Sequence, residues 1–170
     1  LGVFIYYLVG ARYRWSLILA ASYFFYAFWK VEYLPVILGA TIVNYYVAIL
    51  MGGEGIKSKR RKYLIVSLVA GLGLLFLFKY FDFFANSVND IFRRVGISFE
   101  FPLLDLIMPI GLSFYTLQTL GYILDVYHGK RSPERHFGIF AVYVSFFPIV
   151  LSGPIERSMH LLPQLRRMHE

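Results

Sequence analysis

The stretch YLPVILGATIVNYYVAILM, residues 33–51, is an uncharged apolar run that is long enough to cross a membrane as a helix. A helix rises about 1.5 Å per residue and the hydrocarbon core of a bilayer is about 30 Å thick, so roughly 20 residues are needed. Residues 102–124 form a second run of this length. The two runs predict membrane-spanning helices.

Four further apolar runs are shorter, and they cover residues 1–9, 15–29, 63–78 and 137–151. We expect the runs over residues 15–29 and 137–151 to extend into flanking residues, to thin the bilayer locally, or to form re-entrant pieces buried among other helices. The predicted fold class is all-α. We expect a polytopic integral membrane protein with about five or six hydrophobic segments, in a single membrane domain over residues 1–170.

The composition supports lipid rather than water as the solvent of this chain. Of its residues 58% are hydrophobic and 16% are charged, against roughly 25% charged in soluble domains. The absence of cysteine excludes disulfides and thiolate metal sites. The net charge of +7 is distributed between apolar runs rather than along one polar face, which favours a role in membrane orientation and argues against nucleic acid as a partner.

The basic residues also predict which connecting segments face the cytoplasm. Residues 11–14, 52–62 and 125–136 hold two, five and three Lys or Arg, and they would share one side of the membrane. The opposite side would hold Lys30, Lys79, Arg93 and Arg94. Because cytoplasmic loops carry the excess of Lys and Arg, we expect the first set of segments to be cytoplasmic.

Residues 81–95 differ from the other apolar stretches because apolar and polar positions alternate at helical spacing. The apolar positions are Phe81, Phe84, Val88, Ile91 and Val95. This pattern is typical of an amphipathic helix. We expect it to lie in the outer membrane interface, and a membrane helix that extends into water is the alternative.

The first stretch with possible chemistry is PIGLSFYTLQTLGYILDVYHGK, residues 109–130. At helical spacing Tyr115, Gln118, Thr119 and Tyr122 share one face. This face is a candidate lining for a polar funnel that accepts a carbonyl or hydroxyl substrate. The alternative is hydrogen bonding between helices, which such side chains commonly provide in bilayers.

The second stretch is FFPIVLSGPIERSMHLLPQL, residues 146–165, in which prolines predict a broken helix. Glu156, Arg157 and His160 follow within one helical turn. Arg157 could clamp a carboxylate or phosphate while Glu156 or His160 pairs with it. An interfacial ion pair at a helix start is the alternative.

Other common catalytic motifs are missing from the sequence. It has no GxxxxGK[ST] loop, no HExxH and no GxSxG. His128 and His136 flank a basic loop, where we expect solvated side chains and no metal site.

These two stretches, together with AASYFFYAFWKVEYLPVILGATIVNYYVAIL, residues 20–50, resemble the N-terminal half of bacterial membrane-bound O-acyltransferases, and among them the alginate O-acetyltransferase membrane subunits. The resemblance implies a multi-pass enzyme of the bacterial inner membrane with no bound cofactor. It implies an acyl donor, acetyl-CoA or another acyl thioester, and an exported polysaccharide such as alginate as acceptor. It also implies periplasmic or other extracytoplasmic partner proteins.

The resemblance further implies that the catalytic histidine lies downstream of this chain, because His128, His136, His160 and His169 do not match it. We therefore expect the chain to be truncated at both ends and inactive alone. Arg157 occupies the position of the family's GPI-x-R arginine. A transporter, or a noncatalytic assembly subunit of a polysaccharide export system, is the alternative function.

Overall fold

The computed structural model describes residues 14–53, 55–109, 111–146 and 162–163. Within these residues the chain is helical and contains no strand. The elements are α2 (Arg14–Trp29), the 3₁₀ turn η2 (Val31–Tyr33), α3 (Leu34–Gly53), α4 (Lys57–Lys79), α5 (Phe81–Val95), α6 (Leu112–Tyr127) and α7 (Phe137–Ser145). The predicted all-α class is confirmed.

The prediction of one continuous span over residues 102–124 is wrong. Residues 97–109 form no helix, and α6 begins only at Leu112. Proline at positions 102 and 109 disfavours helix in the preceding residues, and Gly111 adopts a left-handed backbone with φ +72° just before the helix. This left-handed glycine sets the direction in which α6 leaves the turn.

The run over residues 63–78 gains length from the basic residues that precede it. The helix α4 starts at Lys57 and contains 23 residues, so it is about 34 Å long. Val31–Gly53 and Lys57–Lys79 are the two helical stretches in the described part of the chain that are long and apolar enough to cross a membrane.

The exposed side chains of α4 are largely apolar. Large apolar side chains on several sides of this helix are exposed, including Val66, Val69 and Leu72. A helix that is apolar all round is unsuited to water. The fold is therefore that of a helical membrane protein.

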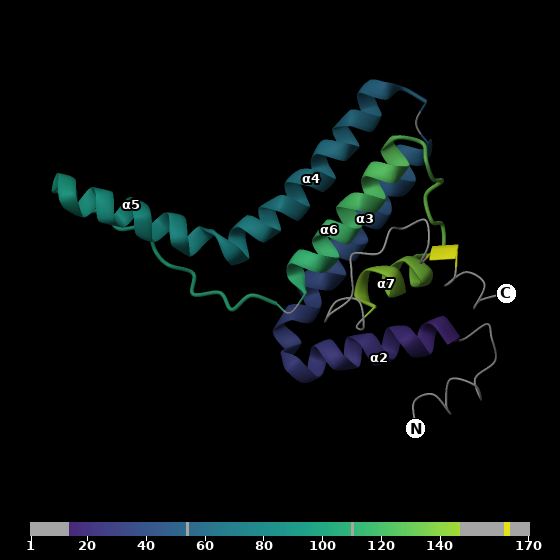
Figure 1. The fold of residues 1–170 in the computed structure, drawn as a ribbon, viewed down its shortest axis with the longest axis horizontal. Helices are drawn as coiled ribbons and strands as arrows, with labels where there is room; N and C mark the ends of the chain where they lie inside the picture. Colours follow the sequence, from purple (N-terminus) through teal and green to yellow (C-terminus); the bar gives the residue numbers. More distant parts are fainter. Residues whose placement is uncertain (1–13, 54, 110, 147–161, 164–170) are drawn as a thin grey trace.

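The helices form two groups (Figure 1). In the first group α3, α4 and α6 pack side by side. In the second group α2 packs along α7, and this pair crosses the first group at a steep angle. The two groups are joined through α6, which contacts α3, α4 and α7, and through α3, which contacts α2, α4, α6 and α7.

The amphipathic segment is confirmed as the helix α5, with the bounds that the periodicity predicts. It leaves α4 at a sharp angle and extends away from the other helices (Figure 1). The chain then returns along α5: the Asn89 amide bonds to both backbone groups of Phe101, and Leu104 donates its backbone N–H to Asp82. Side chains of α5 thus satisfy backbone groups of a segment that has no helix of its own.

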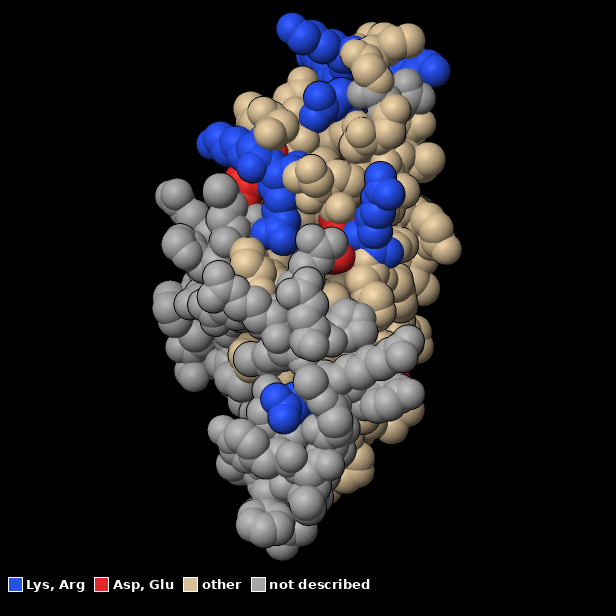
Figure 2. Space-filling model, turned by 90° about the vertical axis from the view of Figure 1, so that its right-hand side faces the viewer, with Lys and Arg blue, Asp and Glu red and all other residues tan. Residues whose placement is uncertain are grey.

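Two of the three basic segments that we expected on one side of the membrane, residues 52–62 and 125–136, meet at one end of the molecule, and most of the third, residues 11–13, lies outside the described residues. Arg60 donates from one guanidinium nitrogen to the backbone oxygens of Val126 and Tyr127, at 2.8 Å each, and Pro133 packs against Gly52. In Figure 2 most of the visible Lys and Arg side chains lie toward this end. The turn between α3 and α4 and the loop between α6 and α7 therefore form a single basic end.

Candidate functional site

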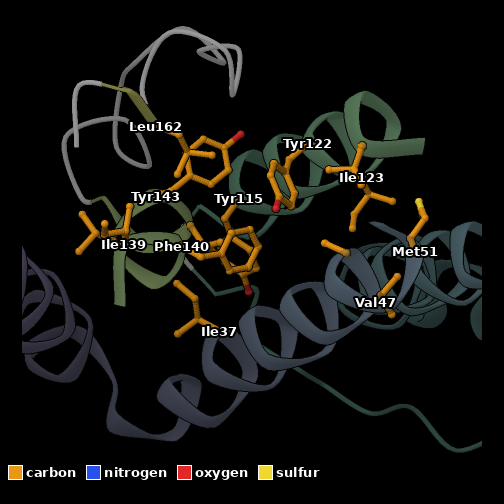
Figure 3. Close-up of a cluster of buried hydrophobic side chains, with 14 of the residues drawn as sticks. Ile37, Val47, Met51, Tyr115, Tyr122, Ile123, Ile139, Phe140, Tyr143 and Leu162 are labelled. Atoms are coloured by element: carbon orange, nitrogen blue, oxygen red, sulfur yellow. The ribbon is translucent and has the colours of Figure 1, made fainter. Parts of the chain in front are cut away.

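The four residues that we predicted on one face of α6 all lie in the core. Tyr115, Gln118, Thr119 and Tyr122 are each at most 2% exposed. The face points toward α7 and α3, where Tyr115 and Tyr122 lie among Ile37, Phe140 and Tyr143 (Figure 3). The periodicity therefore identified a buried polar face inside a membrane protein.

Gln118 joins α6 to α7 through two hydrogen bonds. Its side-chain amide donates to the Tyr143 backbone oxygen at 3.0 Å. In return the Tyr143 hydroxyl donates to the Gln118 backbone oxygen at 3.2 Å. This pair is the interhelical hydrogen bonding that was the alternative to substrate contact.

Two other polar groups of this face also bond within the protein. The Tyr122 hydroxyl accepts the backbone N–H of Glu134 at 2.8 Å, and so fixes the buried part of the loop between α6 and α7. The Thr119 hydroxyl bonds to the backbone oxygens of Tyr115 and Thr116 one turn earlier. Substrate contact by Gln118, Thr119 and Tyr122 stays a prediction, and the structure shows a packing role for each of them.

Tyr115 is the exception on this face. Among the described residues its buried hydroxyl has no hydrogen-bond partner, and the same holds for Ser22 and Tyr26 on α2. Ser22 and Tyr26 are one turn apart and are the buried residues of their helix. Tyr26 and Tyr115 belong to the same cluster of buried side chains.

We take these three buried hydroxyls, two on α2 and one on α6, as the candidate site. A buried hydroxyl without a partner costs about 1–3 kcal/mol. A ligand that offers an acceptor oxygen would recover that free energy, because each hydroxyl can donate one hydrogen bond. The arrangement suits a carbonyl or hydroxyl oxygen rather than an anion, because it carries no charge.

The described histidines form hydrogen bonds with backbone groups and do not belong to this site. The His136 ring nitrogen Nδ1 accepts the Ile139 N–H at the start of α7, and Trp15 packs edge-on against the His136 ring at 5.0 Å. His128 is exposed, as expected, and bonds to the Leu124 backbone oxygen. His136 is only partly exposed, so its expected solvation is wrong: it caps a helix.

The second predicted group of site residues lies outside the described part of the chain. Glu156, Arg157 and His160 all belong to residues 147–161. The helix α7 ends at Ser145, just before that segment. Among the described residues no cluster of His, Asp or Glu could hold a metal ion, and the expectation of no metal stays a prediction.

Sequence reasoning missed Ser22, Tyr26 and Glu134. We placed Tyr26 with the aromatic residues of the membrane interface, but it is 4% exposed while its neighbours Phe24 and Phe28 are 73% and 84% exposed. The spacing of Ser22 and Tyr26, four residues apart, was the available signal. Glu134 gave no signal, because it lies in a charged loop and is buried only by tertiary packing.

Comparison with known proteins connects this chain to enzymes that acetylate polysaccharides. It is 38% identical over 161 residues to the probable alginate O-acetylase AlgI of Pseudomonas aeruginosa, a match covering 94% of this chain and 31% of that protein. It is 35% identical to the peptidoglycan O-acetyltransferase of Helicobacter pylori, over 86% of this chain and 31% of that protein. The chain is a homologue of these O-acetylases.

The match covers only part of each relative. The chain spans about a third of the length of the curated relatives that it matches. The probable alginate O-acetylase of Pseudomonas putida gives a similar result, with 38% identity over 94% of this chain and 33% of that protein. No family model matches the chain, and no solved structure matches it.

Proposed function

We propose that the full-length protein transfers acetyl groups to hydroxyls of an exported polysaccharide. The homology with alginate and peptidoglycan O-acetylases carries this proposal. The two named acceptors are different polymers, and what they share is a sugar hydroxyl on a polysaccharide. The acceptor class is therefore a polysaccharide, with alginate as one candidate.

The arrangement of the helices supports a cytoplasmic donor and an outer acceptor. We place the basic end of the molecule in the cytoplasm, following the positive-inside rule, and α5 at the outer interface. The protein would be a multi-pass component of the bacterial inner membrane. Its acyl donor would be acetyl-CoA or another acyl thioester, and extracytoplasmic proteins would complete the acetylation pathway.

In this proposal the hydroxyls of Ser22, Tyr26 and Tyr115 bind an oxygen of the acetyl donor or the sugar acceptor. They are buried and lack partners among the described residues, so a bound oxygen would be held by donors that are already in place. Both described histidines bond to backbone groups. We therefore assign the general base to a histidine outside the described residues, in line with the membrane-bound O-acyltransferase resemblance.

The experiment is complementation of a strain in which the native gene is deleted, with the acetyl ester content of the exported polysaccharide as readout. The full-length protein should restore acetylation, and Tyr115→Phe should reduce it at least about ten-fold, the effect of losing roughly 1.4 kcal/mol of binding to the reacting state. Tyr46→Phe is the matched control, because the Tyr46 side chain is exposed. Absence of acetylation with the wild-type protein at normal membrane levels would refute the proposed activity.

A second prediction concerns the sequence-predicted arginine, which lies outside the described residues. Arg157→Ala in the full-length protein should abolish or strongly reduce O-acetylation without affecting membrane insertion. Arg157→Lys tests the reason, because lysine keeps the charge but loses the planar fork of donors. Unchanged acetyl content in the Arg157→Ala strain would remove this residue from the proposed site.

A further inference from the structure

The chain between α6 and α7 carries two histidines whose rings make opposite hydrogen bonds to the backbone. The His128 ring nitrogen Nδ1 lies 2.8 Å from the Leu124 backbone oxygen. Because a carbonyl oxygen only accepts, this nitrogen is the donor and carries a hydrogen. The His136 ring nitrogen Nδ1 lies 3.2 Å from the Ile139 backbone nitrogen. A backbone N–H only donates, so this nitrogen is the acceptor and carries no hydrogen.

The two bonds therefore respond differently to a proton. A neutral imidazole has one donor and one acceptor nitrogen, whereas both nitrogens of the protonated ring are donors. Protonation leaves the bond from His128 to its carbonyl oxygen in place. Protonation of His136 puts a hydrogen on the nitrogen that accepts the Ile139 N–H, so that bond is lost. The bond of His136 exists only with the neutral ring.

The bond of His136 is the cap of α7. His136 is the N-cap residue, and its side chain satisfies one of the backbone N–H groups that lack a partner in the first turn of a helix. The helix has nine residues and no acidic residue in its first turn. A positive charge at this position is repelled by the positive end of the helix dipole. Protonation thus removes a stabilising bond and adds an unfavourable charge at the same helix end.

The groups around His136 come from its own loop and from two neighbouring helices. The buried Glu134 accepts the His136 backbone N–H at 3.1 Å. From α2 the ring meets Trp15, which does not titrate and follows Arg14 in the chain. From α3 Tyr45 donates its hydroxyl to the loop backbone. On the loop Glu134 favours a charged ring, and the basic residues oppose it, which are Lys130, Arg131 and Arg135.

The start of α7 is connected to the rest of the helix pair. Trp15 packs edge-on against the His136 ring at 5.0 Å and also closely against Gly138. Further along α7, Tyr143 and Gln118 of α6 exchange two hydrogen bonds. A start of α7 that loses its cap therefore loosens the contact of α7 with α2.

We propose that His136 is a pH-sensitive cap: the neutral ring holds the start of α7 against α2, and protonation of the ring releases it. Histidine is the side chain that changes charge between pH 5 and 8. Because the folded state favours the neutral ring, the stability that the cap gives is present at the upper end of this range and is lost as the pH falls. The inference depends on the described helices and is independent of acetyl transfer.

The test is hydrogen–deuterium exchange of the purified full-length protein at pH 7.5 and at pH 5.5, followed by mass spectrometry of peptides from the start of α7. Rates are normalised to those of unstructured peptides at each pH. Protection of the first turn of α7 should fall about five-fold at the lower pH, the usual effect of losing an N-cap. His136→Asn should abolish this response, because asparagine keeps a side-chain acceptor at the N-cap and does not titrate. His136→Ala, which lacks the acceptor, should show the low protection at both pH values.

His128→Asn is the matched control, because it replaces the other histidine of the same loop and should keep the full pH response. Thermal unfolding gives a second readout: the wild type and His128→Asn should lose more stability between pH 7.5 and pH 5.5 than His136→Asn does. A wild-type protein whose α7 protection does not change with pH would overturn the proposal. So would an equal pH response in the wild type and His136→Asn, or a response that disappears in His128→Asn.

Discussion

At the scale of single residues, the buried polar groups of α6 fall into two kinds. The side chains of Gln118 and Tyr122 form hydrogen bonds with backbone groups of α7 and of the loop before it. Tyr115 presents a hydroxyl that has no such use among the described residues. The first kind should matter for stability and the second for ligand binding.

This distinction gives a stability prediction. Tyr122→Phe leaves the buried Glu134 N–H without its acceptor, which should destabilise the protein by about 1–3 kcal/mol. Tyr115→Phe removes an unpartnered hydroxyl and should leave stability unchanged or slightly higher. Thermal unfolding of the two purified full-length variants measures the difference, and equal loss of stability in both would contradict the assignment.

The sequence was sufficient to place Tyr115, Gln118, Thr119 and Tyr122 on one helical face, because that follows from 3.6 residues per turn. The hydrogen-bond partners of these side chains could not be predicted from the sequence. The bond from Gln118 to Tyr143 joins positions 25 residues apart, and the bond between Tyr122 and Glu134 depends on how the loop packs. Such partners follow from tertiary packing, which one sequence without homologues does not specify.

At the scale of elements, the contact between α2 and α7 depends on the smallest side chain. Trp15 of α2 packs so closely on Gly138 of α7 that an added Cβ would overlap the indole ring. The same ring packs against His136, which caps α7. One tryptophan therefore positions the start of α7 against α2.

The prediction at this scale is that Gly138→Ala destabilises the protein by about 1–3 kcal/mol, because overpacking forces the two helices apart. A smaller ring partner should relieve the clash, so Trp15→Leu combined with Gly138→Ala should lose less stability than the sum of the two single changes. Thermal unfolding of the single and double variants tests this. Additive losses would show that the two residues do not interact as described.

The helix boundaries could be predicted where the apolar periodicity was strong. The prediction failed where the backbone geometry of proline and glycine set the boundary. The bounds of α5 follow from its apolar stripe. The start of α6 does not follow from hydropathy, because residues 102–111 are as apolar as the helix that they precede. Only Pro109 and the left-handed Gly111 mark the boundary there.

At the scale of the whole molecule, the positions of the basic segments and of α5 are the basis of the proposed orientation. The basic segments around Lys57–Lys62 and Lys130–Arg135 meet at one end, and α5 leaves the other end of α4 (Figure 1). The central claim is that these ends lie on opposite sides of the membrane, so that a cytoplasmic acetyl donor can serve an exported acceptor. The sequence predicted that these basic segments share one side of the membrane, and the packed structure adds the contacts between two of them.

The most direct measurement is two-sided cysteine labelling in intact cells. The chain has no cysteine of its own, so a reporter at Ser58 in the basic end and another at Asn86 on α5 can be compared in a full-length protein freed of any other cysteines. A membrane-impermeant maleimide should label Ser58→Cys only after the cells are opened, whereas Asn86→Cys should react in intact cells. Labelling of both positions from the same side would contradict the proposed arrangement of donor and acceptor faces.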